Sequence, residues 1–509
     1  MDSSSTVHVA RGTSYIIIQN ITASAAMVVS FAVLARLITP KEMGIWAVLL
    51  LVNGLCQVLA TLAVPQAATK FVAEHLGRGE KDVAASVFYQ AIRTTLILAA
   101  PLGLIVFLGA TVLSTQLLGA AEHVLLFQFL AFDIILSAGL LPVLSAAMLG
   151  LQRFKETAVV GIVSGTLVRQ CLIIILVIVL RDLVGLVIAW VISDVISSLL
   201  YMAYILRALG PPRFEFALRE LLRFSWPLYL SNAVTFASAW FDRAILLMFV
   251  PLATLGVYNA TITAFGVLGN VSGAMASTLL PAYSAMQSSN QRQTLSDAVR
   301  MASRYASIVA TPLALGLVAT AKPALTLFVG QIYVEGAEPL AIFAGAFAFT
   351  LVGTVLTPML LALGETPKAS AITAASVVVS LLAAFILLPL WGIVGAAVAR
   401  GFAMILTTAL TIIVLSKMLT LQLDLEAMWK SLVSGVVMAA VVFAAQIPWY
   451  SRFLLPVYAF VGALTYFACL RILRTLRPSD TELVRRYLGP RFRFLVDPVE
   501  RYLVTQEDN

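Results

Sequence analysis

Long runs of apolar residues, separated by short polar segments, recur from one end of this chain to the other. A helix of about 20 apolar residues is long enough to cross the hydrocarbon core of a bilayer. Fourteen runs reach this length, at residues 13–38, 43–64, 86–113, 124–149, 157–180, 183–206, 224–250, 255–285, 304–328, 339–363, 369–389, 392–416, 431–449 and 453–473. Charged residues make up only 11% of the 509 residues, against about 25% in soluble domains. The pattern predicts an all-α polytopic membrane protein with about 14 transmembrane helices.

The segments between the runs exclude several classes of site. Few loops exceed about 20 residues, too short for a soluble catalytic domain. The cysteines lie inside apolar runs and the histidines lie far apart, so neither a disulfide framework nor a metal centre is expected. These residues are Cys56, Cys171, Cys469, His8, His75 and His123. No G-x-x-x-x-G-K-[ST] motif occurs, so we expect no ATP hydrolysis through a P-loop and no cofactor. The polar N-terminus enters a full-length span without a small-residue cleavage site, which favours an uncleaved helix.

The basic residues predict the orientation. If the N-terminus is cytoplasmic, 24 of the 33 Lys and Arg fall in the N-terminus, the even-numbered loops and the C-terminal tail, and only Lys41, Arg181 and Arg452 fall in odd-numbered loops. Cytoplasmic loops carry an excess of Lys and Arg. Both termini are therefore expected in the cytoplasm and the chain in the cell membrane. The net charge of +8 reflects this orientation, and no nucleic-acid partner is expected.

Two stretches match without gaps, "RTTLILAAPLGLIVFLGATVLSTQLLG" from Arg93 and "RYASIVATPLALGLVATAKPALTLFVG" from Arg304. Equivalent residues lie 210 to 212 apart elsewhere too: Pro40 and Pro251, Asn20 and Asn232, Gly185 and Gly395. Span 1 thus corresponds to span 7, and span 6 to span 12. Six spans per repeat give both halves the same orientation, with an axis along the membrane normal.

The repeat predicts a domain organisation. We expect an N-terminal six-helix lobe at 1–210, a C-terminal six-helix lobe at 211–420, two added helices at 421–474 and a basic amphipathic cytoplasmic tail at 475–509. Two six-helix lobes that rock about a central cavity are the architecture of an alternating-access carrier. Gene duplication without transport is the alternative. The tail is expected to adsorb to the anionic inner leaflet, because it is rich in arginine.

Four segments carry a family resemblance. "ARLITPKEMGIWAV", from Ala35, resembles the A-R-L-x-x-P-x-E-x-G-x-aromatic stretch of polysaccharide flippases, with Trp46 where Tyr is usual. "VPQAATKFVAEHLGRGE", from Val64, is similar to the loop after their second span, and "WFDRAILLMFVPLATLGVYNA", from Trp240, to their seventh span. "WGIVGAAVA", from Trp391, opens span 12 in the same way. The resemblance is to the polysaccharide-transporter branch of the multidrug/oligosaccharidyl-lipid/polysaccharide exporter superfamily, which includes Wzx-type O-antigen flippases and, more distantly, lipid II flippases.

What the resemblance implies is translocation of a polyprenyl-(pyro)phosphate-linked oligosaccharide from the cytoplasmic to the outer leaflet, for surface polysaccharide or glycan biosynthesis. The lipid-linked oligosaccharide and membrane lipids would be its partners, and the protein would be no enzyme. A polysaccharide polymerase or glycosyltransferase partner stays open.

Ionisable residues inside spans are costly and mark functional sites. The cations are Arg36, Arg93, Arg169, Arg243, Lys322 and Arg400, and the acids are Asp133, Asp194 and Asp242. Full pairing still leaves three cations, as expected for a site that binds a (pyro)phosphate, because Arg offers bidentate contacts to phosphate. We therefore predict a substrate site in the central cavity that includes Arg243, Arg400, Lys322 and Arg169, with Arg36 added. The counterparts of Arg243, Lys322 and Arg400 in the first repeat are the uncharged Ala32, Thr111 and Ala189.

Each of these polar span residues also has a structural interpretation, which competes with a role in substrate binding. Arg36 can snorkel to the outer interface, Arg93 and Arg304 can anchor the inner interface, and Arg169 can form a buried pair with Asp194. Asn20 and Asn232 can bind sugar hydroxyls or join helices, and Trp240 can stack on a sugar ring or pack between lobes.

The acids predict the coupling site. Because a membrane carboxylate can exchange a proton, Asp242, Asp194 and Asp133 are candidates for proton or sodium coupling. A cation-coupled multidrug antiporter of the same superfamily is the main alternative function, disfavoured by the cationic excess and by the lack of an acid in span 1. A glycan-modifying transferase in the membrane is the alternative of another class, and would need a carboxylate or His cluster near one face.

Overall fold

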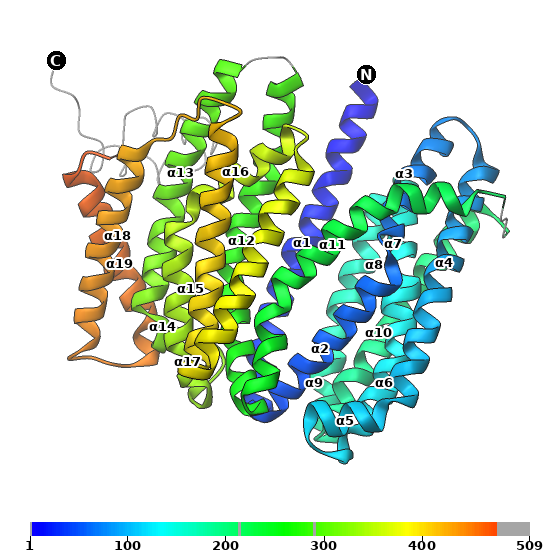
Figure 1. The fold of residues 1–509 in the computed structure, drawn as a ribbon, viewed down its shortest axis with the longest axis horizontal. Helices are drawn as coiled ribbons and strands as arrows, with labels where there is room; N and C mark the ends of the chain where they lie inside the picture. Colours follow the sequence, from blue (N-terminus) through cyan, green and yellow to red (C-terminus); the bar gives the residue numbers. More distant parts are fainter. Residues whose placement is uncertain (1–2, 212–214, 289–291, 476–509) are drawn as a thin grey trace. The chain divides into compact units, whose positions relative to one another are not determined.

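The computed structural model of the protein describes residues 3–211, 215–288 and 292–475. Regular structure in this part of the chain is entirely helical (Figure 1). The contacts divide the chain into two compact units, unit 1 up to Asn259 and unit 2 from Ala260. The lobe boundary predicted after residue 210 is the point where the second copy of the sequence repeat begins. This boundary stays a prediction. The predicted amphipathic tail lies outside the described residues beyond Thr475.

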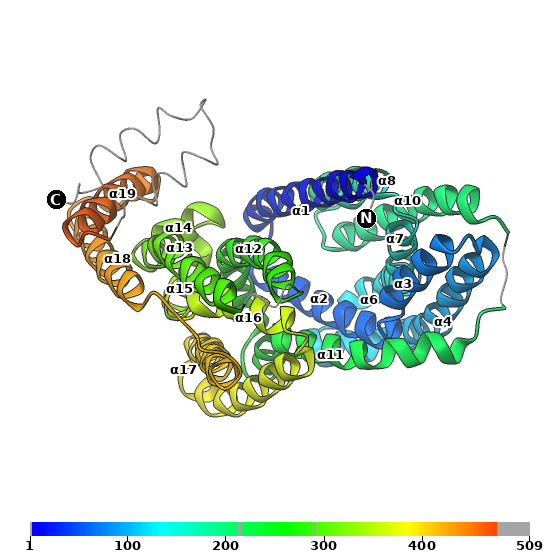
Figure 2. The ribbon, with the colours of Figure 1, turned by 90° about the horizontal axis from the view of Figure 1, so that it is seen from above.

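Unit 1 is a bundle of helices, seen end-on in Figure 2. Its elements are α1 (Ser3–Leu37), α2 (Pro40–Thr61), α3 (Val64–Gly77), α4 (Lys81–Leu108), α5 (Ala110–Leu118), η1 (Ala121–His123), α6 (Val124–Ile134), η2 (Ile135–Leu140), α7 (Leu141–Gly150), α8 (Phe154–Ile162), η3 (Val163–Val168), α9 (Arg169–Leu180), α10 (Val184–Leu209), α11 (Leu218–Phe249) and the start of α12 (Leu252–Ser288).

Unit 2 is a second helical bundle. After α12 it contains α13 (Arg292–Ala319), α14 (Ala321–Phe328), η4 (Gln331–Gly336), α15 (Ala337–Phe349), α16 (Leu351–Ala362), α17 (Thr366–Ser416), α18 (Leu425–Gln446), η5 (Arg452–Leu454) and α19 (Leu455–Ile472).

Twelve helices of the described chain are long and apolar enough to cross a membrane, which confirms a polytopic all-α membrane protein. One of them, α17, covers two predicted spans that meet at Gly392, whose φ of 55° and ψ of −132° are not helical. Glycine adopts this conformation without the steric cost of a Cβ. Predicted span 7 falls in α11, which is not among the twelve. The total of fourteen spans therefore stays a prediction.

The start of α2 shows how the loop sequence sets a helix end. The Thr39 side chain accepts a hydrogen bond from the Glu42 backbone N–H at 3.3 Å, and the Glu42 carboxylate accepts one from the Thr39 N–H at 2.7 Å. This reciprocal capping box satisfies two backbone donors that a helix start otherwise leaves unpaired. Pro40 occupies the first turn, where its missing N–H costs nothing.

The two stretches that match in sequence also share a local structure within their own units. Helix α4 contains Pro101, breaks at Gly109 and continues as α5. Helix α13 contains Pro312, breaks at Thr320 and continues as α14. Gly119 and Gly330, which follow the two short helices, both have positive φ. The repeat layout of the whole chain stays a prediction, but these segments have the same order of helix, break and short helix.

One predicted loop is a helix. Residues 64–77 form α3, whose Val64, Ala67 and Val72 are buried in a core cluster with residues of α4, α7 and α10. The segment is too short and too polar to be found as a span, since it carries Lys70, Glu74 and His75. Its apolar residues recur at helical spacing, and this spacing is the sequence signal from which α3 could have been predicted.

Candidate functional site

A first polar group lies inside unit 1, where α2 meets α6. Asp133 is completely buried, and one carboxylate oxygen accepts a hydrogen bond from Asn53 Nδ2 at 3.1 Å. Asn53 Oδ1 in turn accepts one from Ser137 Oγ at 3.1 Å, and Gln57 donates to the Ser137 carbonyl at 3.1 Å. Asn53 of α2 thus supplies a neutral donor to the carboxyl group, and Ser137 and Gln57 extend the hydrogen-bond network around it.

A second acid in unit 1 is paired. Asp194 on α10 is 1% exposed and lies 3.1 Å from Arg169 Nη2 at the start of α9. The arginine side chain is 27% exposed, and its guanidinium lies 5.9 Å from the centre of the Trp190 ring. The geometry of Arg169 and Asp194 therefore agrees with the structural interpretation, in which the two residues form a buried pair.

Asp133 and Asp194 interact electrostatically with each other and with Arg169. Asp133 Oδ1 is buried without a hydrogen-bond partner among the described residues, and Asp194 Oδ1 lies 3.1 Å from Arg169 Nη2. Buried charges need partners, and here two carboxyl groups face one guanidinium. A monovalent cation, either a proton or a metal ion, would balance this group. The positive charge of Arg169 is therefore already balanced by these carboxyl groups.

Two short π-helical segments shape this group. Asp133 lies two residues before the start of η2, which contains Ser137, and Arg169 directly follows η3, which contains Ser164. Ser193 donates to the Ser164 carbonyl at 3.0 Å. A π-turn adds a residue to the helix and shifts the side chains that follow, and such turns are frequent at functional sites.

A second polar group of unit 1 contains three predicted site residues, all on α11. Asp242 is fully buried and accepts a hydrogen bond from Tyr258 on α12 at 2.7 Å. Arg243, 9% exposed, places its guanidinium 4.4 Å from the centre of the Trp240 ring and donates to the Ala239 carbonyl at 3.3 Å. The two charged neighbours therefore point different ways, as their helical spacing requires.

The remaining predicted residues are spread over both units. In unit 1, Asn20 and Arg36 are exposed on α1, and Asn232 is half-buried on α11. In unit 2, Arg400 is half-buried on α17, and the exposed Lys322 on α14 lies 5.1 Å from the centre of the Tyr450 ring. Among the described residues, no three His, Cys, Asp or Glu side chains gather as metal ligands.

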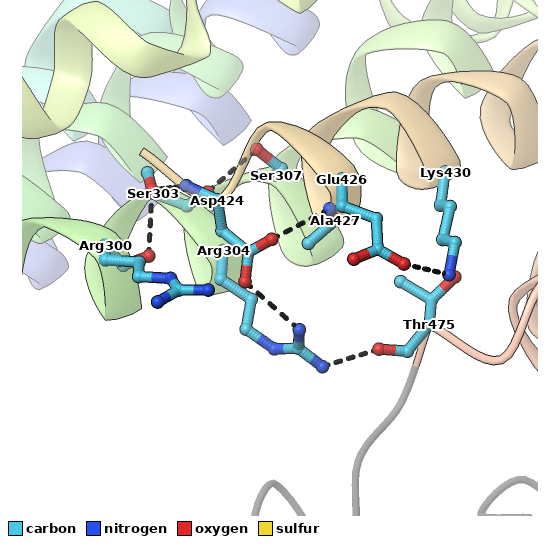
Figure 3. A network of polar contacts seen from close by, with 9 residues as sticks. All are labelled: Arg300, Ser303, Arg304, Ser307, Asp424, Glu426, Ala427, Lys430 and Thr475. Atoms are coloured by element: carbon cyan, nitrogen blue, oxygen red, sulfur yellow. Dashed lines mark hydrogen bonds and ion pairs between the residues drawn. The ribbon is translucent and has the colours of Figure 1, made fainter. Parts of the chain in front are cut away.

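The buried Arg304 of unit 2 joins three segments (Figure 3). Its Nη1 donates to Asp424 at 3.3 Å and its Nη2 to the Thr475 carbonyl at 2.5 Å. Asp424 also accepts a hydrogen bond from the Ala427 N–H at 3.0 Å and so caps α18. The arginine therefore ties α13 to the start of α18 and to the end of the α19 segment, which gives it a structural role.

Sequence reasoning missed several partners of the predicted residues. Asn53, Ser137, Tyr258 and Asp424 are not among the site residues predicted from the sequence. Each contacts its partner across helices, 16 to 120 residues away. Such contacts leave no signal in the local sequence, apart from the polar character of Asn53 and Ser137 within apolar runs.

Comparison with known proteins gives one family and two curated relatives. A sequence model described as polysaccharide biosynthesis protein matches residues 33–338. The probable low-salt glycan biosynthesis flippase Agl15 of Haloferax volcanii is 26% identical over 255 residues, 50% of this chain and 52% of that protein. The succinoglycan biosynthesis transport protein ExoT of Rhizobium meliloti is 28% identical over 310 residues, 60% of this chain and 59% of that protein. The chain thus matches little more than half the length of these relatives.

Solved structures establish the fold. The lipid II flippase MurJ in an inward closed conformation matches with a TM-score of 0.73 at 12% identity, over 92% of this chain and 99% of that one. An inward-facing multidrug resistance transporter of the MATE family matches with a TM-score of 0.62 at 18% identity, over 80% of this chain and 94% of that one. At these identities the likeness concerns the fold alone.

Proposed function

The chain belongs to the polysaccharide biosynthesis protein family, and from this membership we propose that it is a flippase for polyprenyl-(pyro)phosphate-linked oligosaccharides in the cytoplasmic membrane. The family match to residues 33–338 carries the proposal, because both curated relatives are named for glycan biosynthesis. The fold shared with a lipid II flippase is consistent with it. Both termini would face the cytoplasm, and the two six-helix lobes would alternate access.

The substrate site of this proposal is cationic. Arg243, Arg400 and Lys322 would bind the lipid (pyro)phosphate, with Trp240, Asn232, Asn20 and Arg36 toward the sugars or the membrane surface. Arg243 is the best-supported member, because Trp240 holds its guanidinium from one side at 4.4 Å. Cation–π contact with an aromatic face orients the plane of an arginine guanidinium. Arg169 moves from this group to the coupling group, since Asp194 balances its charge.

The test is complementation of a flippase-deficient strain, with membrane abundance measured alongside. We expect Arg243→Gln and Arg400→Gln to abolish flipping while the protein still inserts and folds, and the Arg→Lys variants to lose less. Lys81→Gln, which removes an exposed charge at the start of α4, is the matched control and should complement fully. Full activity of the combined Arg243 and Arg400 Gln variant would refute the cationic site and favour the multidrug antiporter, whose fold is shared.

Energy coupling would use the acids of unit 1. Asp133 and Asp194 face one guanidinium, so binding of one proton or sodium ion neutralises the group and its release leaves a net negative charge. Asp242 accepts a hydrogen bond from Tyr258 and ranks below them.

The coupling proposal is tested in proteoliposomes with an imposed ion gradient. Asp133→Asn and Asp194→Asn should each remove the dependence of transport on the gradient, because the amide neither binds nor releases a proton. Asp242→Asn should affect it less. Gradient-driven transport by the triple Asp→Asn variant would mean that these acids are structural and that the energy comes from consumption of the substrate on the far side.

A further inference from the structure

The N-terminal part of α11 presents two arginines and a tryptophan on one face. Arg219, Arg223 and Trp226 follow each other at spacings of four and three residues, which places them in one row. Together with Leu218, Leu222 and Pro227 they line a shallow, open hollow on unit 1. All three side chains of the row are exposed, Trp226 to 58%.

The opposite face of the same helix part is fixed to the core of unit 1. Leu221 and Ser225 are buried. The Phe224 ring packs edge-on against Phe71 of α3 with centroids 5.6 Å apart, and the Lys70 ammonium lies 4.3 Å from the Phe224 centroid. The row of arginines is therefore held on a packed helix and not on a loose loop.

The two arginines differ from Arg78 and Arg153, two other exposed arginines of unit 1, in lacking a partner among the described residues. Arg78 pairs with Glu74 at 2.6 Å, and Arg153 pairs with Glu156 at 3.1 Å. Among the described residues, neither Arg219 nor Arg223 makes a hydrogen bond or ion pair, although Glu220 directly follows Arg219 and precedes Arg223 by three residues. Two guanidinium groups four residues apart therefore have their donors free for an anion.

The apolar Trp226 of the hollow lies at the start of predicted span 7. Trp226 and Leu230 are 58% and 52% exposed, and both fall in the run predicted at 224–250. In Figure 1 α11 slants across the upright helices of unit 1. Tryptophan is enriched at the level of lipid headgroups, and a helix with a basic and an apolar side can lie in this interface.

We infer that this face of α11 binds the phosphate of an anionic phospholipid, with Arg219 and Arg223 on the phosphate and Trp226 and Leu222 beside the glycerol and the acyl chains. The charge and the apolar surface are complementary to that headgroup, and a neutral or zwitterionic lipid would leave the net positive charge uncompensated. Binding requires only the membrane location of unit 1 and not flipping activity.

Native mass spectrometry of the full chain in detergent tests the inference. Phosphatidylglycerol is titrated onto the protein, with phosphatidylcholine of the same acyl chains as the neutral probe. Arg219→Gln with Arg223→Gln should weaken the tightest phosphatidylglycerol site by about 30-fold, and the double Lys variant should keep most of the affinity. Arg153→Gln with Arg207→Gln removes the same charge from other exposed positions of unit 1 and should change the affinity less than twofold.

The thermal unfolding midpoint of each variant shows whether it is folded, and lipid binding is read without any transport assay, so a failed flippase hypothesis leaves this result standing. Equal affinity for the two lipids, or unchanged phosphatidylglycerol binding in the Gln variant, would overturn the inference. Displacement of phosphatidylglycerol by a lower concentration of polyprenyl phosphate, lost in the same variant, would also overturn it and assign the face to the transported lipid.

Discussion

Arg93 and Arg304 hold equivalent positions in the two matching stretches but differ in their surroundings. Arg93 is exposed on α4, whereas Arg304 is 5% exposed and bonds to Asp424 and Thr475. The partners of Arg304 belong to the segments beyond the repeat. Arg304 thus attaches the start of α18 and the segment after α19 to α13. The sequence predicted an anchor at the inner interface of the membrane, whereas Arg304 is buried, and its partners lie more than 100 residues away and could not be predicted.

Removal of the Asp424 carboxylate tests this role. In Asp424→Ala, Arg304 loses its carboxylate partner while it stays buried, and α18 loses its cap. We expect a loss of about 3–5 kcal/mol in stability, measured by thermal or denaturant unfolding in detergent. The matched control is Glu426→Ala, two residues further along, which breaks an exposed pair with Lys430 and should cost about 0–1 kcal/mol. Equal losses in the two variants would contradict an anchoring role for the buried pair.

For the buried acids, as for Arg304, the sequence identifies the residue but not all of its partners. Asp133, Asp194 and Asp242 stand out from the sequence because a charge inside an apolar run is costly. The pair of Asp194 with Arg169 could be predicted, because consecutive helices at a similar depth are neighbours. The proximity of Asp133 to that pair could not, because it depends on how α6, α9 and α10 pack.

At the scale of elements, α2 and the start of α12 cross at two glycines within unit 1. A Cβ on Gly44 would overlap the backbone of Leu252, whose carbonyl carbon is 2.7 Å away. A Cβ on Gly256 would overlap the Pro40 carbonyl and lie 2.7 Å from the Gly44 nitrogen. Both glycines follow a proline, Pro40 or Pro251, by four or five residues. The crossing therefore joins two stretches that the repeat makes equivalent.

Because backbone atoms cannot yield as a flexible side chain can, Gly44→Ala should force the two helices apart. We expect a loss of about 1–3 kcal/mol from the overpacked contact, seen as a lower unfolding midpoint in detergent. Gly266→Ala on α12 is the matched control, since no atom lies within 4 Å of its added Cβ. There the change should stabilise the helix by about 0.5–1 kcal/mol. A Gly44→Ala variant as stable as the parent would show that the crossing is loose.

Helices could be predicted from the sequence where a strong signal lies within the segment itself. The long apolar helices, such as α4 and α10, follow from runs of about 20 apolar residues. The breaks at Gly109 and Thr320, the π-turns η2 and η3, and the helix α3 do not, because they depend on packing against other helices or are too short for a span signal. The runs predicted at 369–389 and 392–416 meet at the non-helical Gly392, and Pro389 and Gly392 are residue types that interrupt a helix.

At the scale of the whole molecule, the repeat relates features that each unit shows by itself. In unit 1, a Cβ on Gly185 would lie 2.7 Å from the Leu176 carbonyl carbon; in unit 2, a Cβ on Gly395 would lie 2.6 Å from that of Leu387. Both glycines thus allow a helix to start close against the end of the preceding one. The predicted repeat is consistent with this shared geometry, and it predicts special roles for the charged residues that the two halves do not share.

The orientation of the molecule is predicted from charge alone and can be tested at the two ends of one span. Residues 154–180 form one membrane-crossing stretch of 27 residues, and the exposed Lys155 and Asp182 lie at its opposite ends. Because 24 Lys and Arg fall on one predicted side and three on the other, the side with Lys155 should be cytoplasmic. In a chain without Cys56, Cys171 and Cys469, a membrane-impermeant maleimide added to intact cells should label Asp182→Cys but not Lys155→Cys. Lysis of the cells should make Lys155→Cys reactive, which controls for access. The reverse pattern would place the termini outside, whereas labelling of both positions in intact cells would show that residues 154–180 do not cross the membrane.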